Sequence, residues 1–292
     1  MTYVSLLFYI LVMGTVALYY ALPIKRRWVA LVLANAIFIL AFHRTGWWIF
    51  LITILFSYAM SFLINRFEGA LKKVFLIAGI VGVLVPWSMA KYWSVVIAIG
   101  VSFYSLQLIS YLVDIYRDDI EPQKNIFKFF LFISFFPQII QGPIPRYSQL
   151  SHQLIEGHLF DEEKFCRGFY LIIWGFFLKW MIADKAKIIV DTVFNQQPAY
   201  SGAYVWVAGI LYSIQLYADF RGCTTISRGV SLLFGIELVD NFNHPYLASS
   251  VKDFWRRWHM SLSIWLRDYI YIPLGGNRKG NIRKYVNILI TF

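Results

Sequence analysis

Long uncharged stretches alternate with short polar stretches along this 292-residue chain. No Asp, Glu, Lys or Arg occurs in residues 1–24, 45–65, 74–90, 92–113 or 192–218. A helix that crosses about 30 Å of hydrocarbon needs roughly 20 mostly apolar residues, with about 17 as a lower limit. Each of these runs is therefore predicted to be a membrane-spanning helix.

Further spans are predicted at 28–42, 129–145 and 165–183, and another begins at 285–292. In the third of these, Arg167 and Lys179 lie near the ends, where long basic side chains can reach the interface. The pattern thus predicts about eight or nine spans. It indicates an all-α polytopic membrane protein.

Composition and charge support this class. The chain is 59% hydrophobic and 15% charged, whereas soluble domains carry about 25% charged residues. We attribute its net charge of +11 to basic loops that lie in the cytoplasm and contact anionic lipids, and not to nucleic-acid binding. The loops after the first, third and fifth spans hold nine basic residues: Lys25, Arg26, Arg27, Arg66, Lys72, Lys73, Arg117, Lys124 and Lys128. The loops between them hold Arg44 and Lys91, so we expect the N-terminus outside.

The first apolar segment is not predicted to be a removable signal peptide, because it is long and lacks a basic start. Cys166 and Cys223 match no metal or redox spacing. With no repeat or linker, residues 1–292 are expected to form one domain, with 1–94 peripheral and 95–292 forming the core. In the second half charged residues interrupt the apolar runs, and charged segments persist at membrane depth only where they are buried or line a cavity.

The most informative segment is DFWRRWHMSLSIWLRDYIYIPLGGNRKG, residues 253–280. Residues 252–271 are predicted to form one amphipathic, basic, tryptophan-rich helix lying in the membrane interface, with Asp253 at or near its cap. His259 lies at the boundary of the apolar face and is the one strong general-base candidate on this helix. A single histidine on such a helix is more often a packing residue, so the pattern leaves both roles open.

Several motifs together resemble a known family. They are SIQLYADFRGCTTISRGVSLLFGI, NFNHPYLASSVKDFWRRWHMSLSIWLRDYIYIPLGGNR, GVSFYSLQLISYLVDIYR and FISFFPQIIQGPIPRY. From about Gly100 onward the chain is similar to the membrane-bound O-acyltransferase family, in the bacterial branch that O-acetylates alginate or D-alanylates teichoic acids. The resemblance implies a ring of transmembrane helices around a funnel or tunnel, with interfacial or re-entrant amphipathic helices.

The resemblance also implies a function. It predicts transfer of an acetyl or other short acyl group from a cytoplasmic thioester, either acetyl-CoA or an acyl-carrier protein, toward hydroxyls of an extracytoplasmic polysaccharide. No bound cofactor or metal is expected. The expected partners are membrane lipids, the donor or its carrier protein, an extracytoplasmic acetylation protein and the polysaccharide, and the expected location is the bacterial cytoplasmic membrane.

The resemblance assigns one of two family histidines to His259 and places the other beyond Phe292, so the chain is expected to be an N-terminal portion that is inactive alone. Further residues expected to line the tunnel are Trp258, Arg256, Ser261, Asp253 and Asp219. Two other functions stay open at this point. The chain could be a polysaccharide or lipid-linked sugar transporter without chemistry, or a scaffold that docks a carrier protein through its basic segments.

Overall fold

The structure, a computed structural model, describes residues 5–42, 46–92, 100–195, 200–278 and 280–291. Within these ranges every regular element is a helix, which confirms the all-α prediction. The elements are α1 (Leu6–Ala21), η1 (Ile24–Arg26), α2 (Arg27–Phe42), α3 (Trp47–Arg66), α4 (Gly69–Tyr92), α5 (Val101–Tyr116), α6 (Ile126–Ser134), α7 (Tyr147–Glu156), α8 (Glu162–Phe176), η2 (Phe177–Ala183), α9 (Asp184–Asn195), α10 (Ala203–Leu232), η3 (Pro245–Leu247), α11 (Val251–Arg257), α12 (Met260–Leu266), η4 (Arg267–Tyr271) and α13 (Gly280–Thr291).

Three helices in the described ranges are long and apolar enough to cross a membrane: Trp47–Arg66, Gly69–Met89 and Glu162–Asn195. The first two match the predicted spans 45–65 and 74–90. The third joins α8, η2 and α9 into one 34-residue helix, longer than the predicted 165–183. The predicted spans 1–24 and 28–42 correspond to the 16-residue helices α1 and α2. The described residues therefore form fewer long apolar helices than the eight or nine spans predicted.

Two of the predicted spans are wrong. In 129–145, α6 ends at Ser134 after nine residues, about 14 Å of helix at 1.5 Å per residue. Pro137 follows closely, and proline restricts the residue before it and lacks the N–H that a helix needs. In 192–218, α9 ends at Asn195 and α10 begins at Ala203. Residues 196–199 between them, like residues 93–99 of the predicted span 92–113, lie outside the described ranges.

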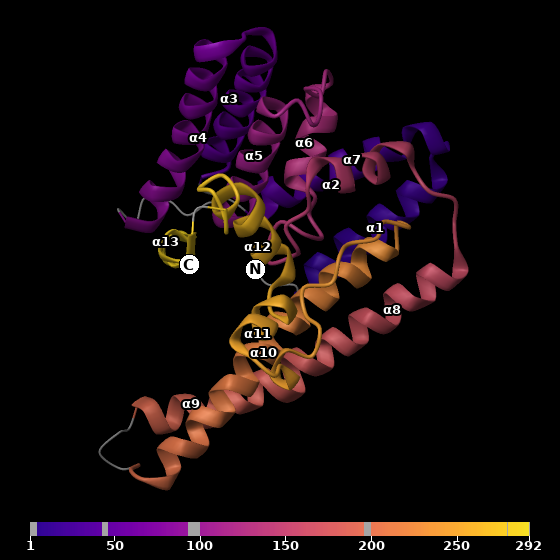
Figure 1. The fold of residues 1–292 in the computed structure, drawn as a ribbon. Helices are drawn as coiled ribbons and strands as arrows, with labels where there is room; N and C mark the ends of the chain where they lie inside the picture. The colour runs from indigo at the N-terminus through magenta and orange to yellow at the C-terminus, as the bar shows by residue number, and fades with distance from the viewer. Residues whose placement is uncertain (1–4, 43–45, 93–99, 196–199, 279, 292) are drawn as a thin grey trace.

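The helices α8 and α10 lie side by side (Figure 1). Two pairs of glycines make this close approach possible. A Cβ atom on Gly229 would lie 2.6 Å from the carbonyl oxygen of Gly168, and one on Gly222 would lie 2.9 Å from that of Gly175. Small residues at such crossings allow helix backbones to pack closely where lipid offers no hydrophobic driving force. Further along this pair, Lys179 of η2 bonds to Asp219 of α10 at 2.6 Å and to Asp184 of α9 at 2.7 Å.

The three basic loops contact one another. Lys72 of the third-span loop pairs with Asp118 of the fifth-span loop at 2.7 Å. Lys128, which the structure places on α6 directly after that loop, lies 5.6 Å from the ring centre of Trp28, on α2 directly after the first-span loop. These contacts bring the loops that we expect in the cytoplasm onto one side of the molecule.

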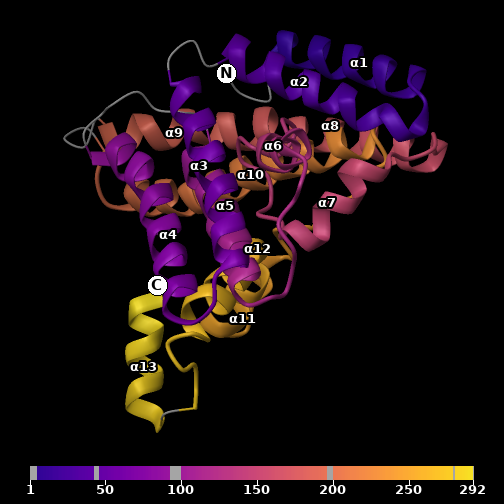
Figure 2. The ribbon, with the colours of Figure 1, turned by 90° about the horizontal axis from the view of Figure 1, so that it is seen from above.

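The segment 252–271 is not the single helix that the sequence predicted. The helix α11 ends at Arg257, α12 begins at Met260, and η4 continues as a π-helix. Its second half is fixed to α5, because the indole Nε1 of Trp265 donates to the carbonyl oxygen of Leu106 at 3.0 Å. The hydroxyl of Tyr269 donates to Asp114 at 2.7 Å. Figure 2 shows α11, α12 and α13 together at one edge of the molecule.

Candidate functional site

The break between α11 and α12 lies at His259. Its backbone has φ 43° and ψ 54°, in the left-handed region. Most non-glycine residues avoid this region, whereas histidine, asparagine and aspartate enter it more readily. A continuous 3.6-residue pattern on both sides concealed the break, because a single left-handed residue leaves the apolar spacing of each half intact.

Asn241 holds the chain that follows the break. Its carbonyl oxygen accepts from the amide of Met260 at 3.0 Å, and its side-chain Oδ1 accepts from the amide of Ser261 at 3.1 Å. These two amides belong to the first turn of α12, where helix amides have no partner within the helix. The hydroxyl of Ser261 in turn accepts from the amide of Ile144 at 3.0 Å. Segments from three parts of the chain therefore fix the position of His259.

The side chain of His259 is buried, with 9% of its surface exposed. Its ring meets Phe220 of α10 edge to face, with 4.8 Å between the ring centres. Burial lowers the pKa of His259 from 6.5 to about 4, against a smaller opposing contribution from a backbone hydrogen bond. The imidazole is therefore neutral at pH 7. Its Nδ1 is buried and has no hydrogen-bond partner among the described residues, so in the tautomer with the proton on Nε2 it would accept a hydrogen bond from a ligand that reached it.

Trp258, the residue before the break, belongs to an aromatic cluster. Its ring stacks on Phe254 at 5.5 Å and meets Phe242 edge to face at 5.1 Å. Tyr217 of α10 lies 6.1 Å away. The cluster packs the residues around the break against α10.

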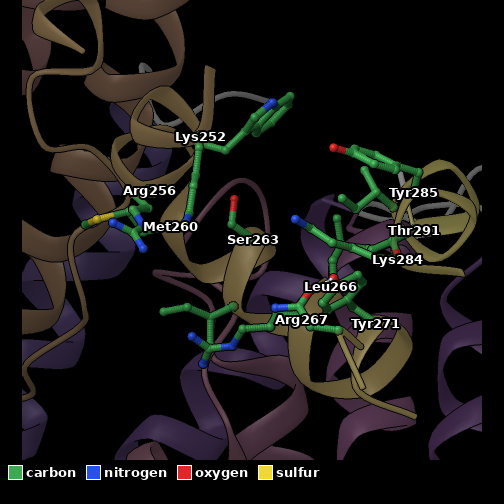
Figure 3. A pocket seen from close by; sticks show the side chains of 14 residues that line it. Lys252, Arg256, Met260, Ser263, Leu266, Arg267, Tyr271, Lys284, Tyr285 and Thr291 are labelled. Atoms are coloured by element: carbon green, nitrogen blue, oxygen red, sulfur yellow. Dashed lines mark hydrogen bonds between the residues drawn. The ribbon is translucent and has the colours of Figure 1, made fainter. Parts of the chain in front are cut away.

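Two pockets flank α12. One, of about 600 Å³, is lined by residues of α11, α12, η4 and α13, including Arg256 (Figure 3). The other, of about 330 Å³, is lined by Ser261, Arg146 and Tyr269 among others. Met260 and Ile264 line both pockets, so a single turn of α12 separates them. His259 itself lines neither pocket, although its neighbour Met260 lines both.

The other expected site residues do not share one cavity. Asp253 pairs with Arg257 at 3.0 Å, which lowers the pKa of this carboxyl. It also accepts from the amide of Ser249 at 3.2 Å, next to the capping residue Ser250, so it serves the start of α11 as predicted. Asp219 is engaged by Lys179. Arg256 and Ser261 line different pockets, and Trp258 lies in the aromatic cluster.

The comparison with protein families gives a match over residues 122–292 to the family described as MBOAT, membrane-bound O-acyltransferase. The chain belongs to the membrane-bound O-acyltransferase family. This confirms the resemblance that the motifs indicated.

The chain is similar to curated proteins with several different names. The protein named "Probable alginate O-acetylase AlgI" of Pseudomonas fluorescens is 40% identical over 197 residues, which are 68% of this chain and 39% of the relative. A peptidoglycan O-acetyltransferase of Helicobacter pylori is 31% identical over 285 residues, or 82% of this chain and 54% of the relative. A teichoic acid D-alanyltransferase of Bacillus subtilis is 32% identical over 180 residues, or 60% and 45%. The chain thus spans about two fifths to half of the length of these relatives.

The sequence analysis named none of Asn241, Phe220 and Tyr269 as a site residue. Asn241 begins the motif NFNHPY, which is rich in turn-forming residues. This setting could have identified it from the sequence. For Phe220 no local signal existed, because its contact with His259 joins residues far apart in sequence. Among the described residues, no three His, Cys, Asp or Glu side chains gather as a metal site.

Proposed function

We propose that this chain forms part of a membrane O-acyltransferase that passes an acetyl or other short acyl group from a cytoplasmic thioester toward hydroxyls of an extracytoplasmic polysaccharide. The observation that carries the proposal is the buried, neutral His259 with an unpartnered Nδ1 at a helix break. The family relatives, which are named for O-acetyl or D-alanyl transfer, support the reaction class.

The chemistry requires little from the protein. In the reaction the hydroxyl oxygen attacks the thioester carbon, the tetrahedral oxyanion collapses, and the thiol leaves while the hydroxyl proton passes to a base. A thioester is already activated, so the protein must orient the hydroxyl, take its proton and exclude water. In this proposal His259 orients the hydroxyl or relays its proton, and a second histidine, which the family resemblance implies, is the base.

The setting of His259 supports this role in two ways. Its neutral imidazole is able to accept a hydrogen bond at pH 7, which a protonated ring cannot do. Its contact with Phe220 and its fixed backbone hold the ring in one place, so that a hydroxyl finds the acceptor already oriented. We further propose the bacterial cytoplasmic membrane as the location and an extracytoplasmic acetylation protein as a partner.

The test replaces His259 by alanine in the full protein and measures acetyl groups transferred from labelled acetyl-CoA to the cell-envelope polymer fraction. We expect transfer to fall by about 10²- to 10⁴-fold, the usual contribution of proton transfer, with unchanged protein in the membrane.

His244 provides the matched control. It has nearly the same backbone conformation, φ 45° and ψ 58°, at the start of η3, but its side chain is exposed. The variant His244→Ala should keep most of the transfer. Normal transfer by His259→Ala would refute the role of His259, and acceptor transport without any acyl donor would favour a transporter instead.

A further inference from the structure

The larger pocket beside α12 carries concentrated positive charge. Four basic residues line it, Lys252 and Arg256 from α11, Arg267 from η4 and Lys284 from α13. Among the described residues that line this pocket, none is acidic. Figure 3 shows Lys252 and Lys284 extending from opposite walls toward Ser263, so these two cations face the same space.

Three of these four basic residues form no salt bridge within the described part of the chain. Arg267 pairs with Asp268 at 2.7 Å. For Lys252, Arg256 and Lys284, no salt bridge is formed with any carboxylate in the described part of the chain. Like charges that converge on a partly enclosed space repel one another and raise the local concentration of anions. The pocket therefore favours an anionic ligand.

The remaining lining suits an amphiphilic ligand. Met260, Ile264 and Ile288 form apolar walls, and three aromatic residues, Trp255, Tyr271 and Tyr285, surround them. Tryptophan and tyrosine beside basic residues are typical of the boundary between a membrane and water.

The pocket also adjoins a surface suited to lipid. On α13, Ile282 is 84% exposed and Leu289 is 79% exposed. Arg117, in a loop that we expect in the cytoplasm, donates to the carbonyl oxygen of Asp268 at 3.0 Å and so connects the pocket's η4 wall to the basic side of the molecule. The cytoplasmic leaflet carries the anionic lipids that attract such residues.

We propose that this pocket binds the headgroup of an anionic phospholipid, with the phosphate among Lys252, Arg256 and Lys284. The lipid's acyl chains then run along the apolar face of α13. A water-soluble phosphate ester would find the same cations, but it would make no contact with the apolar side chains of α13 beside the pocket. The site is separate from His259, which does not line the pocket.

The experiment measures retention of phosphatidylglycerol and of phosphatidylcholine on the purified full protein by native mass spectrometry. The test variant carries Lys252→Gln, Arg256→Gln and Lys284→Gln. The control variant carries Lys91→Gln, Lys185→Gln and Lys187→Gln, which remove the same charge from exposed basic residues outside the loops that we expect in the cytoplasm. We expect the preference for phosphatidylglycerol to fall by about 100-fold in the test variant, given the usual contribution of each basic residue near anionic lipid, and to stay near the wild-type value in the control.

Equal loss in both variants, or no loss in the test variant, would overturn the proposal. Displacement of phosphatidylglycerol from the wild-type protein by free coenzyme A would also overturn it, because the pocket would then belong to a soluble phosphate ester. Melting in neutral detergent verifies that the triple variant folds. If it does not fold, Lys284→Gln alone should lower the preference about 5-fold. Retention is measured without acyl donor, so a failure of the acyl-transfer proposal leaves this result interpretable.

Discussion

Two histidines fifteen residues apart have almost the same backbone and very different surroundings. His244 and His259 both precede a short helix with φ near 45°. His244 is exposed, whereas His259 is buried against Phe220. Together with Asp118 they are the non-glycine residues with positive φ in the described ranges. Nearly the same backbone bend therefore occurs at a buried and at an exposed histidine. The bend alone does not identify the functional residue.

The difference comes from what holds each bend. Around His259, Asn241 binds two successive amides and Ser261 binds a third segment. After His244, the turn is closed locally by the amide of Leu247, which donates to the carbonyl oxygen of His244 at 3.1 Å. A left-handed non-glycine residue costs roughly 1–2 kcal/mol. At His259 the left-handed conformation places the ring in a buried site, whereas at His244 it only turns the chain.

The largest difference that we expect between the two histidines is in the pH dependence of stability. The pKa of His259 is about 4 in the folded protein and 6.5 in the reference state. As pH falls below 6.5, the unfolded chain binds the proton first, so the free energy of unfolding decreases until pH 4 and then levels off for this group. The decrease amounts to about 3 kcal/mol. Thermal unfolding in detergent between pH 7 and 4 measures it.

The variants His259→Gln and His244→Gln separate this effect from the rest of the titration. The first should remove the decrease that belongs to residue 259, and the second should keep the wild-type pH dependence. If wild type and His259→Gln lose stability in parallel between pH 6.5 and 4, then the histidine is not held neutral by burial.

A second contrast concerns two asparagines, Asn241, which binds the chain after His259, and Asn243, which directly precedes His244. Asn241→Ala removes the acceptor of the Ser261 amide and leaves a buried donor without a partner, which costs about 1–3 kcal/mol. The exposed Asn243 is the matched control, and Asn243→Ala should change the free energy of unfolding by less than about 0.5 kcal/mol. Denaturation of both variants in the same detergent compares them, and equal losses would show that Asn241 does not hold the break.

The sequence predicted the class of the molecule better than its interior. Apolar runs predicted α3 and α4 closely, because a long uncharged segment needs a helix to satisfy its backbone in lipid. The same rule failed at 129–145 and 192–218. Uncharged residues also occur in irregular segments that are buried in protein, as Phe135 and Phe136 are after the end of α6.

The candidate site was predicted only in part. The motif around His259 identified this histidine as a candidate site residue. The charge pattern of the segment predicted a basic helix in the membrane interface. Packing between distant segments determines the break at His259. It also determines the hydrogen bonds of Asn241 and the contact with Phe220. Hydrophobic periodicity reports only which face of a helix is apolar. It carries no information on which loop reaches the first amides of the next helix.

The smallest effect, at His244, measures the bend itself. Replacing this exposed residue by glycine removes the left-handed strain of about 1–2 kcal/mol, and the greater freedom of glycine in the unfolded chain opposes this by about 0.5–1 kcal/mol. We expect His244→Gly to be about 1 kcal/mol more stable than His244→Ala in detergent unfolding. Because φ and ψ differ by only a few degrees between the histidines, this difference estimates the strain at His259, where packing with Phe220 prevents a direct measurement. If His244→Gly is instead less stable than His244→Ala by about 0.5–1 kcal/mol, the glycine cost alone, then the bend at His244 is not strained.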